Sequence, residues 1–346
     1  MQSCHHAFPI PLVPRGQRIY NWSMTIAPNS SDPPPPLAMP SGVVVVLATW
    51  NGAAHLAQQL QSFRDQTLRP ERLIISDDGS RDATPGLLAR FAASDPGFAV
   101  DIFEGPHCGV AQNFLHLLQR VPERTEVVAL SDQDDVWLPD KTARGMRLLA
   151  AVPAGQPALL GGRSLVCDAR LENRQPSPML RASPTFRHAL VQNFAGGNTM
   201  MLNRAGVDLV RAAATEARRV VVHDWWIYQL ISGAGGVVLV DAEPGLLYRQ
   251  HAGNQIGANV GVRAQVRRLR WMLHGRFRRW NVINLRALGA SAHRFTPENR
   301  ALLDDFARLQ RAGFWARIAL LRRMGLYRQG LEGKLSLWLA VVLGKI

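Results

Sequence analysis

The 346-residue chain is poor in cysteine, and this excludes several kinds of site. Its three cysteines, Cys4, Cys108 and Cys167, are too widely spaced for a zinc-ligand or redox motif. A disulfide framework is therefore not expected, and this favours a reducing compartment.

Two glycine-rich phosphate-binding motifs are also missing. After the apolar run 43–48 the chain reads Ala48-Thr-Trp-Asn-Gly52, not G-x-G-x-x-G and not a loop ending in Gly-Lys-Ser/Thr. This counts against a dinucleotide-binding oxidoreductase and against a P-loop enzyme.

Long hydrophobic runs are absent. The longest late run, Leu335 to Leu343, contains Ser336 and is about half of the roughly 20 residues that a membrane span needs. No charged segment followed by an apolar core precedes residue 40, so we expect no signal peptide. The proline-rich residues 1–40 predict a disordered leader, and Met24 and Met39 are alternative start sites.

Acidic residues are scarce only near the C-terminus. Residues 263–346 hold 18 of the 40 Lys+Arg and 4 of the 26 Asp+Glu, which leaves 22 of each in residues 1–262. A basic region on a neutral body predicts contact with an anionic surface, either membrane or nucleic acid.

An amphipathic stripe opens this basic region. Apolar residues recur at helical spacing over 262–286, with arginines between them, at Val262, Val266, Leu269, Leu273, Phe277 and Trp280. Trp271 and Trp280 suit a headgroup interface. The alternative is that the stripe packs on the rest of the chain.

The first half of the chain alternates between strand and helix patterns. Runs at 43–48, 73–75, 98–103 and 127–130 predict strands, and the segments 53–64, 82–93 and 109–120 predict helices. This order predicts a mostly parallel, Rossmann-like α/β sheet flanked by helices.

The remaining elements follow from weaker patterns. Strands are predicted at 158–166, 198–202 and 236–241, and helices at 185–191, 205–217 and 224–231. We therefore expect three parts: the leader 1–40, an α/β domain over 41–261, and a basic helical extension over 262–346.

Three carboxylates follow the apolar run Val127 to Leu130. Asp132, Asp134 and Asp135 repel one another, and none is expected to be buried unpaired. Mg²⁺ or Mn²⁺ would offset this repulsion, with a substrate diphosphate completing the shell, at a strand end where open α/β sheets bind ligands. The alternative is a polar turn whose aspartates cap a helix that starts near Pro139.

Two other strand ends carry polar side chains. Asp77 or Asp78, in Asp77-Asp78-Gly79-Ser80, can accept hydrogen bonds from a nucleobase or a ribose, although the same residues make a good turn and cap. Trp50 and Asn51 can hold a base, or Asn51-Gly52 can form an ordinary left-handed turn.

Four segments together resemble the family 2 glycosyltransferases. They are Thr49-Trp50-Asn51-Gly52, Asp77-Asp78-Gly79-Ser80, Asp132-Gln133-Asp134-Asp135-Val136-Trp137 and His223-Asp224-Trp225-Trp226. The resemblance covers roughly residues 43–255 and is strongest to bacterial rhamnosyltransferase-like members. It implies a GT-A fold and inverting transfer from a nucleotide sugar, with dTDP-rhamnose as donor and a surface-polysaccharide or lipid-linked glycan as acceptor.

The resemblance also implies roles for single residues. Thr49, Trp50, Asn51, Asp77, Asp78 and Asp132 would contact the donor nucleotide. Asp132 and Asp134 would hold Mn²⁺ or Mg²⁺, with His251 as a further ligand unless it is a solvated loop residue. Arg249 would pair with the diphosphate.

Asp224 corresponds to the catalytic base. An inverting transfer needs a carboxylate to take the proton of the attacking hydroxyl group. Asp224 begins a predicted helix, whose dipole tends to lower its pKa; a helix N-cap would explain it equally well. Gly197 and Asn198 would face the donor sugar and the acceptor, and one of Trp225 and Trp226 would line the acceptor side while the other lies in the core.

The expected partners are thus a nucleotide sugar, a glycan acceptor and an anionic membrane surface, at the cytoplasmic face of the cell membrane. A UDP-hexose or UDP-N-acetylhexosamine donor is the alternative within the same chemistry. The alternative class is a non-catalytic protein whose basic region binds lipid or nucleic acid. Nucleic acid is disfavoured, because carboxylates at three strand ends would repel phosphate without a metal.

Overall fold

The computed structural model describes residues 42–251 and 274–346. The predicted leader 1–40, the predicted boundary at 261 and the first half of the amphipathic stripe lie outside these residues. Residues 38–346 form one compact unit.

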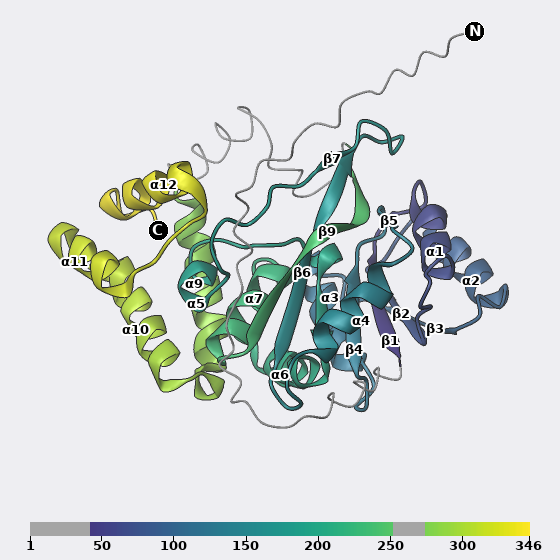
Figure 1. Ribbon diagram of the computed structural model, residues 1–346, viewed down its shortest axis with the longest axis horizontal. Helices are drawn as coiled ribbons and strands as arrows, with labels where there is room; N and C mark the ends of the chain where they lie inside the picture. Colours follow the sequence, from purple (N-terminus) through teal and green to yellow (C-terminus); the bar gives the residue numbers. More distant parts are fainter. Residues whose placement is uncertain (1–41, 252–273) are drawn as a thin grey trace, which may run out of the picture. The chain divides into compact units, whose positions relative to one another are not determined.

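Within the described residues, a sheet of nine strands forms the centre of this unit (Figure 1). Its order is β3-β2-β1-β4-β8-β6-β9-β5, and β7 pairs with β6. The strands are β1 (Val43–Thr49), β2 (Arg72–Asp77), β3 (Ala99–Glu104), β4 (Val127–Ser131), β5 (Val136–Trp137), β6 (Ala158–Cys167), β7 (Gln175–Pro176), β8 (Met201–Asn203) and β9 (Val237–Arg249).

The N-terminal part of the sheet is parallel. Strand β1 pairs in parallel with β2 and β4, and β2 pairs in parallel with β3. Short antiparallel pairings of β8 with β4 and β6 continue the sheet to the parallel β6–β9 pair. The predicted mostly parallel, Rossmann-like α/β sheet is confirmed.

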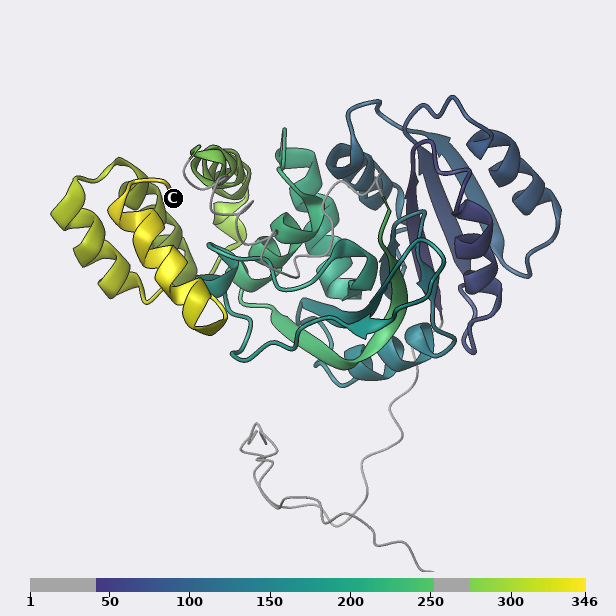
Figure 2. The ribbon, with the colours of Figure 1, turned by 90° about the horizontal axis from the view of Figure 1, so that it is seen from above.

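Helices cover both faces of the sheet (Figure 2). One face packs against α1 (Leu56–Arg64), α2 (Thr84–Ala93) and α4 (Lys141–Ala150). The other packs against α3 (Val110–Arg120), α6 (Arg204–Glu216) and α7 (His223–Gly233), with the short α5 (Phe186–Ala189) beside them.

Strand β1 shows why both layers form. Val43, Val45 and Leu47 enter one apolar cluster, and Val44 and Val46 enter the other. Each such side chain contributes about 1.5–3 kcal/mol when it is removed from water. The prediction of a strand buried on both faces is therefore confirmed.

Two predicted strands differ from the observed elements. The predicted strand 198–202 begins as a 3₁₀ turn, η1 (Gly197–Thr199), because the Asn198 amide turns inward to donate to Asp135. The predicted strand 236–241 continues as β9 to Arg249 through a polar stretch that includes Pro244, and register shifts in the β6–β9 ladder accommodate it.

Four helices follow the undescribed segment: α9 (Arg276–Ala290), α10 (Pro297–Arg311), α11 (Phe314–Met324) and α12 (Gly330–Val342). In α9, Phe277 and Trp280 pack on the core of the α/β domain, and the Trp280 ring lies 6.4 Å from that of Trp225. The described half of the amphipathic stripe therefore follows the packing alternative. No helix in the described ranges is long and apolar enough to span a membrane.

Candidate active site

The carboxyl ends of β1, β2 and β4 meet at one edge of the sheet. Thr49 is in register with Asp77, and Leu47 is in register with Ser131, the last residue before Asp132. Since parallel strands end on the same side, the polar residues that follow them converge there.

The Asp77 carboxylate holds the turn after β2. It accepts hydrogen bonds from Thr49 Oγ1 at 2.8 Å, from Ser80 N at 2.9 Å and from Ser80 Oγ at 2.6 Å. Asp77 therefore acts here as a turn-forming residue, as the alternative interpretation of the Asp77-Asp78 pair allowed.

Asp78 has an unused acceptor. Its Oδ2 accepts from Gly109 N at 2.8 Å, but its Oδ1 is buried and has no hydrogen-bond partner among the residues that the structure describes. Asn113 Oδ1, on α3, is likewise buried and unpaired. Both oxygens lie 2.9 Å from the point that a Cβ at Gly105 would occupy, so only glycine allows the backbone at residue 105 to pass this close to them. Buried acceptors without partners are rare, and this pair suits a ligand with N–H or O–H donors. Asn113 was not predicted, because a single asparagine in an amphipathic helix gives no distinguishing pattern.

Gln133 links the first strand end to the acidic segment. Its side chain accepts from Trp50 N at 2.8 Å and donates to Trp50 O at 2.9 Å. Asn51 adopts the left-handed conformation, φ 48°, so the predicted turn is present. The Trp50 ring is 56% exposed and stands at the sheet edge, where it can stack on a ligand.

The three carboxylates of the acidic segment, Asp132, Asp134 and Asp135, lie in different surroundings. Asp134 Oδ2 lies 2.7 Å from His251 Nε2, which follows β9. Burial, together with the charges of Asp135, Asp134 and Asp224, raises the pKa of Asp132 well above its usual value. These carboxylates therefore form one cluster, and His251 lies at its side.

Asp135 is fully buried, although it is paired as expected. It accepts from Asn198 Nδ2 and, at 3.4 Å, from Arg249 N, and burial raises its pKa to about 7. Lys141 lies nearby with its Nζ 3.4 Å from the centre of the Trp137 ring, and burial lowers the pKa of this lysine to about 7. Asp135 thus ties the acidic segment to Asn198 and β9.

The Arg249 side chain lies beneath the acidic segment. Its guanidinium donates to Asp134 O at 2.9 Å, to Ala169 O at 2.6 Å and to Gln58 Oε1. With only 2% of the residue exposed, Arg249 supports the loop from within and does not extend toward solvent as the predicted phosphate contact requires.

Asp224 lies in the first turn of α7 and faces η1. Its Oδ2 accepts from Gly197 N at 3.1 Å and its Oδ1 from Trp225 N at 2.5 Å. Burial raises the pKa of Asp224 to about 6 and outweighs the hydrogen bonds that lower it. The expected lowering by the helix dipole was wrong, because the carboxylate is buried among core side chains.

Neither tryptophan beside Asp224 lines an open surface. Trp226 is fully buried, and Trp225 is 6% exposed and donates from Nε1 to Ala189 O at 2.7 Å. The expectation that one of them forms an acceptor wall does not fit this packing, since both lie in the core.

Gly197 has no room for a side chain. A Cβ there would lie 2.3 Å from Nε2 of His223, which is buried and stacked on Phe114 with ring centroids 3.8 Å apart. We expect Gly197→Ala to destabilise the fold by about 1–3 kcal/mol and to displace the amide that binds Asp224. Thermal unfolding should show a lower Tm, whereas Gly289→Ala, with nothing within 4 Å, should leave it unchanged or raised. An unchanged Tm for Gly197→Ala would contradict this packing.

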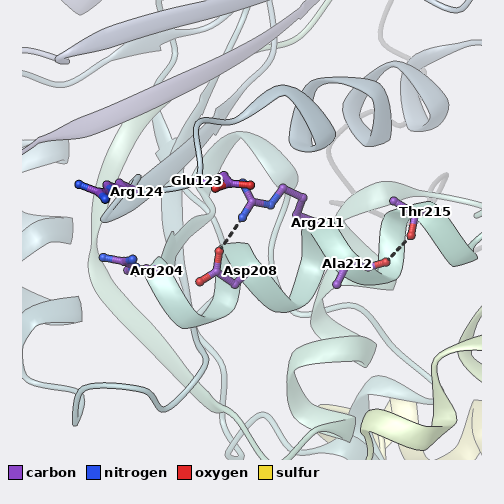
Figure 3. Close-up of a pocket in the computed structure, with 7 residues that line it drawn as sticks. All are labelled: Glu123, Arg124, Arg204, Asp208, Arg211, Ala212 and Thr215. Carbon is purple, nitrogen blue, oxygen red and sulfur yellow. Dashed lines mark hydrogen bonds and ion pairs between the residues drawn. The ribbon is translucent and has the colours of Figure 1, made fainter.

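A surface pocket elsewhere on the domain is not part of this site (Figure 3). It lies over α6 and the loop before β4 and is lined by Glu123, Arg124, Arg204, Asp208, Arg211, Ala212 and Thr215. Arg204 pairs with Glu126, which precedes β4, whereas Asp132 follows that strand. The pocket therefore lies at the opposite end of the strand.

The predicted metal ligands form an incomplete set. Within residues 42–251 and 274–346, no group of three or more His, Cys, Asp or Glu side chains is arranged to hold a metal ion. The Asp134 carboxylate and the His251 imidazole do converge, and one or two protein ligands suffice where substrate phosphates complete the shell. The Asp134 oxygen and the His251 nitrogen together fit Mn²⁺, whereas Mg²⁺, which prefers oxygen ligands, would use the carboxylate.

Comparisons with known proteins agree with this geometry. Residues 44–200 match the family model described as glycosyl transferase family 2. A protein named dTDP-rhamnosyl transferase RfbG, from Shigella flexneri, is 28% identical over 235 residues, which are 64% of this chain and 78% of that protein. Uncharacterized protein Mb1547 of Mycobacterium bovis is 27% identical over 211 residues, 60% of this chain and 58% of its own length.

Among solved structures, a mannosyltransferase from Pyrobaculum calidifontis in complex with GDP-Man and Mn²⁺ aligns with a TM-score of 0.46 and 19% identity, over 82% of this chain and 85% of that one. At this level of similarity it decides nothing about donor or metal. The family match covers the strand ends that carry Thr49, Asp78 and the acidic segment. Residues 44–200 therefore match glycosyl transferase family 2, and the chain is similar to a protein named as a dTDP-rhamnosyl transferase.

Proposed function

We propose that this enzyme transfers rhamnose from dTDP-rhamnose, with inversion, to a surface-polysaccharide or lipid-linked glycan. The observation that carries the proposal is the Asp224 carboxylate, held by Gly197 N at 3.1 Å beside the Asp132 cluster. A carboxylate with a pKa of about 6 is ionised at neutral pH and is basic enough to accept a proton from an attacking hydroxyl group.

The donor nucleotide would bind at the carboxyl ends of β1 and β2. Asp78 Oδ1 and Asn113 Oδ1 offer the unpaired acceptors that the imide N–H of thymine or the ribose hydroxyl groups can use. The exposed Trp50 ring would stack on the base. Uracil presents the same imide group, so this arrangement suits a UDP-sugar as the alternative donor.

A divalent ion would bind at Asp134 and His251, with Asp132 adjoining. When bound, Mn²⁺ or Mg²⁺ would neutralise the diphosphate and stabilise it as a leaving group. Asp134 would serve as ligand, and Asp135 and Arg249 would hold the segment that carries it. The second candidate function, a non-catalytic binding protein, has no comparable observation in its favour.

The buried position of Asp224 predicts the pH dependence of the reaction. Because the base must be ionised, we expect kcat/KM to rise through an apparent pKa of about 6 and to level off above it. A pH–rate profile of the wild type with saturating Mn²⁺ measures this. A profile that falls over the same interval would require a protonated Asp224 and would contradict its role as base.

A panel of donors tests the proposal as a whole. Release of nucleoside diphosphate is measured with dTDP-rhamnose, UDP-galactose and UDP-N-acetylglucosamine, with Mn²⁺ and with EDTA. We expect the highest rate with dTDP-rhamnose and Mn²⁺. A higher rate with a UDP-sugar selects the alternative donor, full activity in EDTA excludes the metal, and no release from any donor favours a binding protein.

The enzyme is proposed to act as a peripheral protein at the cytoplasmic face of the cell membrane. The basic C-terminal region, with 18 Lys+Arg against 4 Asp+Glu in residues 263–346, supports contact with anionic lipid.

A further inference from the structure

The apolar side chains that face solvent gather on the last two helices. Of the twelve large apolar residues exposed in the described part of the chain, seven lie between residues 314 and 343. They are Phe314, Trp315, Leu331, Leu335, Trp338, Leu339 and Leu343. Single exposed apolar residues are normal, whereas such a concentration marks an interaction surface. We call these seven residues the α11–α12 apolar surface.

Helix α12 is apolar on two opposite sides. Leu337, Ala340 and Val341 are buried against the rest of the domain. Leu331 and Leu335 are 77% and 71% exposed, and they begin a row at helical spacing that continues through Trp338, Leu339 and Leu343. A helix that is hydrophobic all round is normally buried on all sides. The outer side of α12 therefore needs a cover that the chain's described part does not supply.

The charges around this surface indicate what covers it. Residues 312–346 contain Arg317, Arg322, Arg323, Arg328, Lys334 and Lys345, against Glu332 as the one acidic residue. Arg322 lies with its Cζ 5.9 Å from the centre of the Trp338 ring, so charge and apolar surface adjoin. A hollow at the start of α12 is lined by Arg181, Arg328 and Lys334 beside Leu331. Apolar residues that include tryptophan, flanked by basic residues, are typical of helices that lie in the interface of an anionic bilayer.

Packing separates this surface from the catalytic edge of the domain. Arg328 donates from Nε to Val191 O at 2.9 Å and from Nη1 to Ser336 Oγ at 3.2 Å, which fastens α12 to the α/β domain. Figures 1 and 2 show α11 and α12 at the end of the domain opposite β1 and β2. Docking through α12 would leave the donor site open to solvent.

We propose that the α11–α12 apolar surface is the part of this protein that docks onto an anionic phospholipid bilayer. This moves the membrane contact from the stripe predicted at 262–286, whose described half packs on the domain through Phe277 and Trp280. The inference rests on the proposal that this enzyme acts as a peripheral membrane protein, but it does not depend on which sugar is transferred.

Vesicle flotation of the full-length chain tests the inference. Vesicles of equimolar phosphatidylglycerol and phosphatidylcholine should bind the wild type, and binding should weaken as salt rises. Leu335→Ser with Leu339→Ser should weaken binding roughly tenfold for each leucine, because the apolar area inserted into lipid is lost. Arg322→Gln with Lys334→Gln should weaken it about fivefold for each charge. The matched control, Ile102→Ser, removes an exposed apolar side chain from the edge strand β3 and should bind as the wild type does.

Several outcomes would overturn the inference. They are no binding of the wild type, full binding by Leu335→Ser/Leu339→Ser, or loss of binding in Arg267→Gln/Arg268→Gln alone. A wild-type dimer that Leu335→Ser/Leu339→Ser dissociates, without vesicle binding, would assign the surface to a second copy of the chain. RNA that competes with the vesicles would assign it to nucleic acid. Tm values equal to the wild type verify folding, and donor turnover without vesicles tests the glycosyltransferase chemistry separately.

Discussion

Asp224→Asn is expected to lower kcat by about 10²–10⁴-fold while donor affinity stays within a few-fold of the wild type. The amide keeps the shape of the side chain and can still contact Gly197 N, but it cannot accept a proton. Steady-state transfer rates and donor titration by calorimetry measure the two quantities. Asp304→Asn, at an exposed position on α10, is the control and should have wild-type kinetics.

The stability of the Asp224 variant provides a second readout. Burial raises the pKa of Asp224 to about 6 in the folded state, so its contribution to stability is fully present below the unfolded pKa and is lost as pH rises through about 6. Asparagine does not ionise, so the variant does not lose this stability as the pH rises. At pH 8 the Tm of Asp224→Asn should therefore equal or exceed that of the wild type. An inactive variant with a strongly reduced Tm would indicate a structural role, and turnover within a few-fold of the wild type would exclude Asp224 as the base.

Asp134→Ala is expected to weaken metal binding and donor binding together and to lower kcat/KM by roughly 10²-fold or more. Charge stabilisation by a bound divalent ion amounts to several kcal/mol, and each 1.36 kcal/mol corresponds to a factor of ten. Donor affinity, measured by calorimetry with and without Mn²⁺, should differ in the wild type and be the same in the variant.

His251→Ala provides the comparison for this site. Because His251 Nε2 lies 2.7 Å from Asp134 Oδ2, its loss should weaken Mn²⁺ binding, though less than the loss of the carboxylate. Asp304→Ala should not change it. Mn²⁺-dependent donor affinity that survives in Asp134→Ala would exclude this residue as a metal ligand.

The sequence alone determined the first half of the domain. The run Val43 to Ala48 is apolar at every position, and only a strand covered on both faces can bury all of it. The sequence also placed Thr49, Asp78 and Asp132 at strand ends, and parallel strands bring such ends to one edge of the sheet. Local patterns sufficed here, since both the strands and the polar residues after them are contiguous in the chain.

Only the tertiary structure decided which residues of the site make internal contacts and which remain available to a ligand. Asp77 and Asp78 are adjacent in the chain. Asp77 accepts hydrogen bonds from Thr49 and Ser80, whereas Asp78 keeps an oxygen without a partner in the described residues, next to Asn113. An arginine at position 249 could pair with a phosphate. In the folded chain, however, Arg249 is buried and donates to groups distant in sequence, such as Gln58.

Tertiary structure also decided the direction of the pKa shift of Asp224 and which apolar helix sides are covered. The pKa of Asp224 rises where a helix N-terminus alone would lower it, because the core that buries it comes from other elements of the fold. The apolar side of α9 that carries Trp280 packs on the domain, whereas α12 buries one apolar side and leaves a second, which carries Leu335, facing solvent. Periodicity reveals an apolar side of a helix, whereas only the assembled fold determines whether another part of the chain covers it.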